Sequence, residues 1–223
     1  MEFRHEEKFE INFSDMLTVR QRMRCVAYPD PHAVNGVYRI RSLYFDSASD
    51  KALRDKLDGV SRREKFRIRC YNGDSSVIHL EKKSKLGGLG NKQTAPLTAQ
   101  QTQRIIDGDI AWMADSEFPL IQELHAKMFS EGLLPRTIVD YTREPFVYPA
   151  GNVRVTLDYD IRTGMRCTDF LNDSCVTVPA SDCIILEVKW DAFLPDIIKD
   201  AVSIEDRRVG AFSKYAACRR FSG

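Results

Sequence analysis

Charged residues recur at every second position of several short apolar segments, and this pattern constrains the fold more than any other feature of the chain. They are Arg4, Glu6 and Lys8; Arg39 and Arg41; Arg67 and Arg69; Glu81, Lys83 and Lys85; Arg154 and Asp158; and Glu187 and Lys189. Residues two apart in a β-strand point to the same face. Apolar residues fill the alternate positions, for example Phe66 and Ile68 between the arginines of one segment. The pattern predicts strands with one apolar and one charged face.

Most of the charged residues in this pattern are arginine and lysine, which limits what the charged faces can be. The alternation in any one strand is explained by a sheet with one face on a core and the other in water. Here Arg and Lys dominate the charged positions of at least six segments, and Arg67 and Arg69 form one of the pairs two residues apart. A guanidinium group presents a planar fork of donors that matches phosphate oxygens. The repetition favours a sheet that encloses a polyanion.

The overall composition limits the partners. The chain has 223 residues and a net charge of only +1, so a basic surface must be local and balanced by acidic residues elsewhere. This argues against a nucleic-acid partner and for a focused anion site. An apolar run long enough to span a membrane is absent, and the charged N-terminus does not read as a secretory signal. Six cysteines without CxxC spacing predict reduced thiols and a cytoplasmic protein.

The order of elements predicts one α+β domain over residues 1–223. Strands are expected at 2–13, 37–45, 61–72, 76–85, 91–97, 135–147, 152–163 and 182–190, and helices at 15–26, 48–57, 98–107, 117–131, 194–201 and 212–221. Ser14 can cap the first helix, and Asn72-Gly73 marks a hairpin. About eight antiparallel strands fit a closed barrel with helices packed on its outside and charged side chains in its lumen.

Four carboxylates share faces with these cations, and two roles are open to them. Glu6, Glu81 and Asp158 can form ion pairs within a crowded cationic sheet, or any of the four can bind a hard divalent cation such as Mg²⁺ or Mn²⁺. Glu187 is the strongest metal candidate because its strand, IILEVKW, is otherwise mostly apolar. Near the C-terminus, Ser213 is a helix cap or a phosphate contact, and Lys214 is either solvated or a phosphate ligand.

Nine short motifs occur in an order that resembles the polyphosphate polymerase (VTC, vacuolar transporter chaperone) domain of the triphosphate tunnel metalloenzyme, or CYTH-like, superfamily. They are RHEEKF, SLYFDS, KFRIRCY, HLEKKSK, GNKQT, YTREPF, VRVTLD, ILEVKW and FSKYA, spread over about residues 3–220. The resemblance implies an eight-stranded tunnel with ATP and polyphosphate as partners. It implies tunnel cations that hold phosphates at Lys8, Arg67, Arg69, Lys83, Lys92, Arg143, Arg154 and Lys214, lesser contacts at Tyr141 and Ser213, an inward-facing Lys189, and a metal ligand at Glu187.

The resemblance also implies an activity, transfer of the ATP γ-phosphoryl group to a polyphosphate chain with Mn²⁺ or Mg²⁺ as cofactor. Arg67, Arg69, Lys83, Arg154 and Glu187 are its expected catalytic residues. Hydrolytic relatives begin with an ExExK strand, whereas this chain has Arg4 at the first Glu position, which favours extension of a chain over hydrolysis. A triphosphate hydrolase and a polyphosphate-binding module without turnover are the alternatives. The chain has no room for an SPX-type regulatory domain or membrane helices, so a stand-alone bacterial protein is expected.

Overall fold

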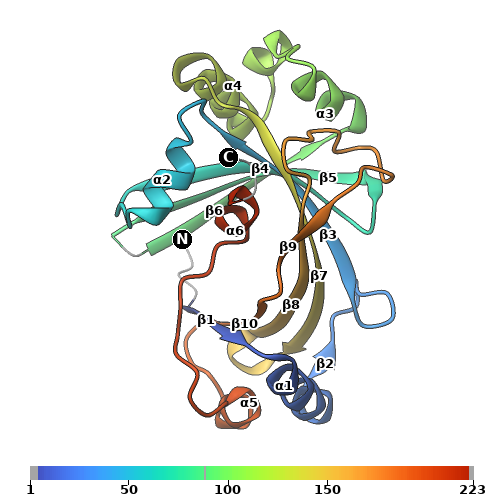
Figure 1. Ribbon diagram of the computed structural model, residues 1–223, viewed down its shortest axis with the longest axis vertical. Coiled ribbons are helices and arrows are strands. Elements are labelled where there is room, and N and C mark those ends of the chain that lie inside the picture. Colours follow the sequence, from blue (N-terminus) through green and yellow to red (C-terminus); the bar gives the residue numbers. More distant parts are fainter. Residues whose placement is uncertain (1–4, 88, 221–223) are drawn as a thin grey trace. The chain divides into compact units, whose positions relative to one another are not determined.

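The structure is a computed structural model that describes residues 5–87 and 89–220, and its strands form a ten-stranded sheet (Figure 1). The strand order is β1-β10-β8-β7-β3-β4-β5-β6, with β2 beside β7 and β9 beside β8. The strands are β1 His5–Ile11, β2 Tyr28–Pro29, β3 Tyr38–Asp46, β4 Arg63–Tyr71, β5 Asp74–Leu86, β6 Leu89–Leu97, β7 Leu134–Tyr148, β8 Val153–Thr163, β9 Val178–Ser181 and β10 Ile184–Trp190. The pairings β1–β10, β10–β8, β3–β4, β4–β5 and β5–β6 are all antiparallel.

The helices lie where the sequence predicts them, and together with the sheet they confirm the α+β class. They are α1 Phe13–Val26, α2 Lys51–Leu57, α3 Ala99–Ile106, α4 Pro119–Glu131, α5 Asp196–Val202 and α6 Lys214–Arg219, with the 3₁₀ turns η1 Ala111–Asp115 and η2 Ala150–Asn152. The predicted cap of α1 is wrong by two residues. Asn12 accepts from the Asp15 backbone N–H at 2.8 Å, and Asp15 accepts from the Asn12 N–H at 3.1 Å. This reciprocal pair satisfies two donors at the helix start.

The chain forms two compact units, which are described separately. Unit 1 comprises residues 1–39, 141–161 and 181–213, and unit 2 comprises residues 40–140, 162–180 and 214–223. Whether residues 1–223 act as one domain stays a prediction.

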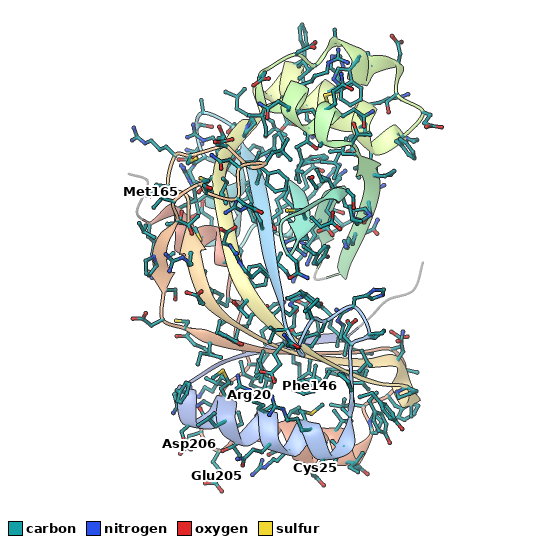
Figure 2. All side chains as sticks on the ribbon, turned by 90° about the vertical axis from the view of Figure 1, so that its right-hand side faces the viewer. Arg20, Cys25, Phe146, Met165, Glu205 and Asp206 are labelled. Atoms are coloured by element: carbon teal, nitrogen blue, oxygen red, sulfur yellow. The ribbon has the colours of Figure 1, made fainter. Side chains whose placement is uncertain are left out.

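In unit 1, helices α1 and α5 lie along one face of β1, β8 and β10 (Figure 1), and side chains fill the space between α1 and the sheet (Figure 2). Apolar residues of these strands form a core with both helices. Val155, Leu157, Leu186 and Val188 alternate along two of these strands and are fully buried with Val19 of α1. The helices therefore cover only one face of these strands, and the alternate side chains point to the other face.

Unit 2 repeats this arrangement with other elements. The face of β3, β4, β5 and β6 that carries Leu43, Phe66, Ile68 and Leu80 packs against α3, η1 and α4, together with Phe170 of the loop that follows β8. In both units the predicted apolar face is the one that the helices cover.

The prediction of a closed eight-stranded barrel is wrong. The sheet is an open path that ends at β1 and β6, and these two strands do not pair anywhere in residues 5–87 and 89–220. The outer edge of β1 is used otherwise, because Phe9 forms a bridge with Val209 and the Gly210 N–H donates to the Lys8 carbonyl at 2.8 Å. Residues near Val209 thus cover the outer edge of β1, with which another strand would have to pair to close the barrel. The same residues keep this edge from pairing with other chains.

The prediction that Arg41 belongs to the charged face is also wrong. In β3, Arg41 lies opposite Cys70 and shares its face with Leu43 and Phe45, on the helix-covered side. It is buried and forms a bidentate ion pair with Asp140, with N–O distances of 3.0 and 2.9 Å. Arg4, on which the choice between extension and hydrolysis depends, lies outside the described residues. Among the described helices, none is long and apolar enough to cross a membrane.

Candidate functional site

The charged face of unit 1 is built by strand register. Lys8 of β1 lies opposite Glu187 of β10, which lies opposite Thr156 of β8. Two residues further along β10, Lys189 lies between Glu6 of β1 and Arg154 of β8. These side chains point away from the face that packs on α1 and α5, because their strand neighbours form that core.

Glu187 is the centre of this face. It is buried, and its carboxylate contacts Lys8 Nζ at 2.8 Å, Lys189 Nζ at 2.8 Å and Arg143 Nη2 at 3.5 Å. Glu6 contacts the same two lysines. Burial lowers the pKa of Lys189 below its ordinary value, and the nearby Arg143 adds to this, although Glu187 opposes both effects. One carboxylate therefore holds three cations together.

Arg143 of β7 is fixed by a second carboxylate. Its Nε and Nη2 both donate to Asp158 of β8 at 2.6 Å, and Asp158 is fully buried. Burial disfavours the charged guanidinium, but Asp158 outweighs that effect and raises the pKa of Arg143 well above its ordinary value. The Tyr141 ring lies 5.5 Å from the guanidinium carbon, in cation–π geometry. Arg154 donates to Asp30 at 2.8 Å and to the Tyr38 hydroxyl.

Unit 2 has its own charged face, and this one is more strongly cationic. Arg67 of β4 lies opposite Tyr44 of β3 on one side and Glu81 of β5 on the other. Lys83 of β5 lies between Lys65 of β4 and Lys92 of β6. The predicted residues Arg67, Arg69, Lys83 and Lys92 thus lie on one face of three consecutive strands.

Glu81 is the carboxylate at the centre of this face. It is buried, and it accepts from Arg67 at 2.7 and 2.5 Å, contacts Lys92 Nζ at 2.6 Å and lies 3.8 Å from Arg69. Arg69 also donates to the Ser42 hydroxyl at 3.1 Å. Burial would raise the pKa of Glu81, but the three cations lower it far below its ordinary value. The carboxylate is therefore ionised throughout the physiological range.

The row Lys65, Lys83 and Lys92 is electrostatically unfavourable. Like charges directly opposite each other across strands are destabilising. Burial lowers the pKa of Lys65, and Arg67 and Lys214 lower it further, while Tyr44 opposes them. Such a row gains most when an anion lies over it. Lys65 is not among the predicted site residues, although its spacing from Arg67 continues the alternation.

Tyr44 is a second residue that sequence reasoning missed. Its hydroxyl accepts from Arg67 Nη1 at 2.8 Å, and its ring stacks on Tyr215 of α6 with centroids 4.9 Å apart. Burial alone would raise the pKa of Tyr44, but Arg67 and Lys65 lower it to about 8. A tyrosine between apolar neighbours carries no sequence signal that distinguishes it from a core residue.

Lys214, the first residue of α6, lies near the cationic face of unit 2, because it is close enough to Lys65 to lower the pKa of that side chain. The Tyr215 hydroxyl donates to Asp46 at 2.7 Å, and Asp46 also accepts from the backbone N–H groups of Ala52 and Leu53 at 2.8 and 3.1 Å. This buried carboxylate anchors α6 and the start of α2 together. Ser213, the other predicted contact in this motif, directly precedes α6 and belongs to unit 1.

The described residues do not form a metal cage by themselves. No group of three or more His, Cys, Asp or Glu side chains suited to a metal occurs in residues 5–87 and 89–220. Glu187 supplies a single carboxylate, and both of its oxygens face ammonium or guanidinium groups that a metal would have to displace. Mg²⁺ commonly binds through one or two carboxylates and completes its shell with water and phosphate oxygens. A metal at Glu187 would therefore take the rest of its ligands from water and phosphate.

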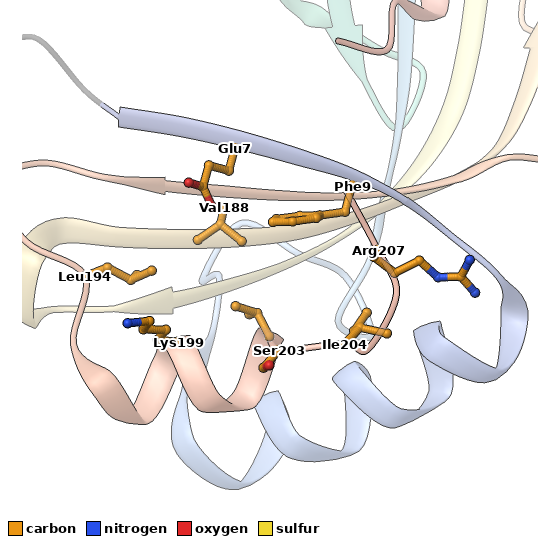
Figure 3. Close-up of a pocket in the computed structure, with 9 residues that line it drawn as sticks. Glu7, Phe9, Val188, Leu194, Lys199, Ser203, Ile204 and Arg207 are labelled. Atoms are coloured by element: carbon orange, nitrogen blue, oxygen red, sulfur yellow. The ribbon is translucent and has the colours of Figure 1, made fainter. Parts of the chain in front are cut away.

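A small pocket lies on the opposite side of unit 1. It has a volume of about 180 Å³ and lies between the apolar face of β1 and β10 and helix α5, lined by residues that include Phe9, Val188, Leu194 and Ile204 (Figure 3). None of the predicted site residues lines it. The pocket is therefore separate from the charged face.

Fold and charge pattern together define a class, an α+β protein whose sheet carries cationic faces opposite its helices. The chain matches the VTC domain over residues 3–222 and belongs to that family, which confirms the resemblance found in the motifs. Membership supports a phosphate-related function. No curated protein matches the chain.

Solved structures give a weaker likeness. One is described as a "putative adenylate cyclase" of Bacillus halodurans, with 12% identity, a TM-score of 0.47, and 90% of this chain and 86% of that chain covered. Another, with the same description and from Vibrio parahaemolyticus, has 8% identity, a TM-score of 0.46, and 89% and 82% coverage.

Proposed function

We propose that this protein is a metal-dependent polyphosphate polymerase that transfers the γ-phosphoryl group of ATP to the end of a polyphosphate chain. The observation that carries the proposal is the cationic face of unit 2, in a chain of the VTC domain family. There Arg67, Arg69 and Lys92 surround the carboxylate of Glu81, and Lys83 lies opposite Lys92. In the reaction, a terminal phosphate oxygen of the chain bonds to the γ-phosphorus while the bond to the β-phosphate oxygen breaks. ADP leaves.

These residues suit phosphoryl transfer because the reaction asks little covalent chemistry of a protein. Positioning and electrostatic stabilisation supply most of the rate enhancement. We assign to Arg67, Arg69 and Lys83 the stabilisation of charge on the transferred group, and the same role to Arg154. Lys92 and Lys214 are the proposed ligands of neighbouring phosphates. In unit 1, the proposed further phosphate contacts are Lys8, Tyr141, Arg143, Lys189 and Ser213.

Glu187 is the proposed ligand of a divalent metal, Mn²⁺ or Mg²⁺. Such an ion neutralises phosphate charge when bound. Lys8 and Lys189, which hold Glu187 in the free protein, would turn to phosphate oxygens as the carboxylate is engaged. Glu6 and Asp158 have contacts suited to organising cations, to Lys8 in one case and to Arg143 in the other.

Purified protein with ATP and Mn²⁺ or Mg²⁺ tests the proposal. Long-chain polyphosphate together with ADP is the expected product. Free phosphate without polymer would support a triphosphate hydrolase in the same fold. If ATP is not consumed but polyphosphate binds, the protein is a binding module without turnover.

A single substitution tests the role of Glu187. Glu187→Gln should abolish turnover and retain polyphosphate binding, because it removes a metal ligand and no cation. Glu144→Gln is the matched control, since Glu144 is also buried in unit 1 but pairs with Arg20 of α1 at 2.7 Å. The control should lose stability and keep its activity while folded. Unchanged turnover in Glu187→Gln would remove Glu187 from the metal role.

A further inference from the structure

We propose that Cys167 and Cys175 are a redox-active pair that forms a disulfide bond when the protein meets an oxidised low-molecular-weight disulfide such as glutathione disulfide. Both lie in the loop between β8 and β9, in unit 2. Their Sγ atoms are 2.9 Å apart, although the two cysteines are eight positions apart along the chain. Both side chains are partly exposed, so a small oxidant can reach them.

The loop already holds both cysteines in place. The Gly164 N–H donates to the Ile138 carbonyl at 2.9 Å, and the Cys167 N–H donates to the Gly164 carbonyl at 2.8 Å. At the other end, the Cys175 N–H donates to the Asn172 carbonyl at 3.0 Å. Phe170, between the two cysteines, is fully buried in the core of unit 2. Since the backbone is fixed on both sides, little more than side-chain rotation is needed to form the bond.

The proposal depends on the 2.9 Å between the two Sγ atoms, and the disulfide formed is the same whichever thiol attacks first. The thiolate is the attacking form. Burial raises the pKa of Cys175 to about 12, and its hydrogen bond to Cys167 adds to this, so the first attack is assigned to Cys167 and the second to Cys175.

The electron balance follows thiol–disulfide exchange. The Cys167 thiolate attacks one sulfur of the oxidant, whose S–S bond breaks and releases a thiolate. Cys175 then loses its proton to that thiolate, and its sulfur attacks Sγ of Cys167. The second thiolate leaves and takes up the proton that Cys167 released to solvent when it ionised. The two cysteines lose two electrons, the oxidant gains them, and two molecules of low-molecular-weight thiol are formed.

The disulfide bond would hold in place a loop whose backbone contacts a buried ion pair. The Asn172 carbonyl, between the two cysteines, accepts from Arg41 Nη1 at 2.7 Å. Arg41 is the residue that pairs with Asp140. A cross-link restricts the unfolded chain and keeps this carbonyl in place. Oxidation should therefore raise thermal stability, whether or not the protein is a polymerase.

Differential alkylation of the full-length protein tests the proposal. Reduced protein is incubated with glutathione disulfide, alkylated and digested with trypsin. Cleavage after Arg166 and Lys189 leaves Cys167, Cys175 and Cys183 in one peptide. The expected product carries one alkyl group, on Cys183, and the midpoint of thermal unfolding rises by several degrees. In Cys175→Ser the remaining Cys167 should carry a mixed disulfide and the midpoint should not rise.

Two outcomes would overturn the proposal. In one, Cys167 and Cys175 stay alkylatable at an oxidant concentration that already modifies the exposed Cys25. In the other, fragmentation of the peptide places the bond on Cys183. Repeating the experiment with Cys183→Ser separates these cases, because the proposed bond must form without that thiol.

Discussion

Replacing Glu81 by glutamine is the sharpest test of the cationic face in unit 2. The substitution keeps the shape of the side chain and removes the negative charge that contacts Arg67, Arg69 and Lys92. It should destabilise the free protein, because two buried guanidinium groups lose their counter-charge. It should also strengthen the binding of a polyanion, because phosphate no longer competes with the carboxylate for those cations.

The structure sets the size of the loss. Removing one partner of a buried ion pair costs about 3–5 kcal/mol. The arginines are 8% and 6% exposed and fall in that class, whereas Lys92 is 48% exposed and its contact with Glu81 adds little. Glutamine can still accept one hydrogen bond, so we expect roughly 3 kcal/mol. For a chain of this length that corresponds to a fall of about 6–12 °C in the unfolding midpoint.

Thermal unfolding with and without tripolyphosphate measures both effects. A ligand at one hundred times its dissociation constant adds about 2.7 kcal/mol of stability, enough to restore most of the loss. The ligand-induced shift should be larger in Glu81→Gln than in the wild type. Glu64→Gln is the control, since Glu64 of β4 lies on the helix-covered face and contacts Lys82 at 3.1 Å and Lys127 at 2.7 Å. It should show a smaller loss and the wild-type ligand shift.

The pH dependence gives an independent check. The pKa of Glu81 is lowered on folding, so its contribution to stability is fully present above the ordinary value of 4.5 and is lost as the pH falls below it. The difference in stability between wild type and Glu81→Gln should therefore be constant from pH 7 to about 5 and narrow below that. Equal ligand shifts in wild type and variant, or a difference that grows in acid, would refute the reasoning.

Three further predictions concern other parts of the molecule. Because the pKa of Tyr44 is lowered to about 8, ultraviolet absorbance should show a phenolate that titrates near that pH and is absent in Tyr44→Phe. The titration should move to higher pH when polyphosphate occupies the cations. The free energy of unfolding of the wild type should rise relative to that of the variant between pH 8 and 10. Arg67→Ala should weaken tripolyphosphate binding roughly 10- to 100-fold by calorimetry, the range of one or two hydrogen bonds to a charged group. Gly151→Ala should cost more stability in urea than Gly59→Ala, because both have positive φ (73° and 69°) but only the first would place a Cβ 2.3 Å from the Phe193 carbonyl oxygen.

Local patterns were sufficient to locate eight of the ten strands and most of the faces, because alternation depends only on the residues of one strand. The two short strands β2 and β9 were missed, since two to four residues are too few to show an alternation. Strand β3 shows where this fails. The alternation of its apolar residues shifts by one position between Ile40 and Leu43. The sequence therefore allows Arg41 on either face, and only packing against the core determines which face it takes. The prediction of a closed barrel failed for a different reason. Closure depends on which distant segment of the chain pairs with an edge strand of the sheet, and local alternation does not reveal this. The role of Tyr44 depends on Arg67 and Lys65, which are far away in sequence.

The internal pairing of the charged faces has a consequence for how salt should act on binding. A polyanion that binds a bare cationic surface releases one counterion for nearly every charge it neutralises, so affinity falls steeply with ionic strength. Here Glu187, Asp158 and Glu81 already serve as built-in counterions for most of the cations. Phosphate must displace these carboxylates, which cannot leave the protein and contribute no entropy of release. The logarithmic salt slope should therefore be well below the number of Lys and Arg side chains in contact with the phosphates.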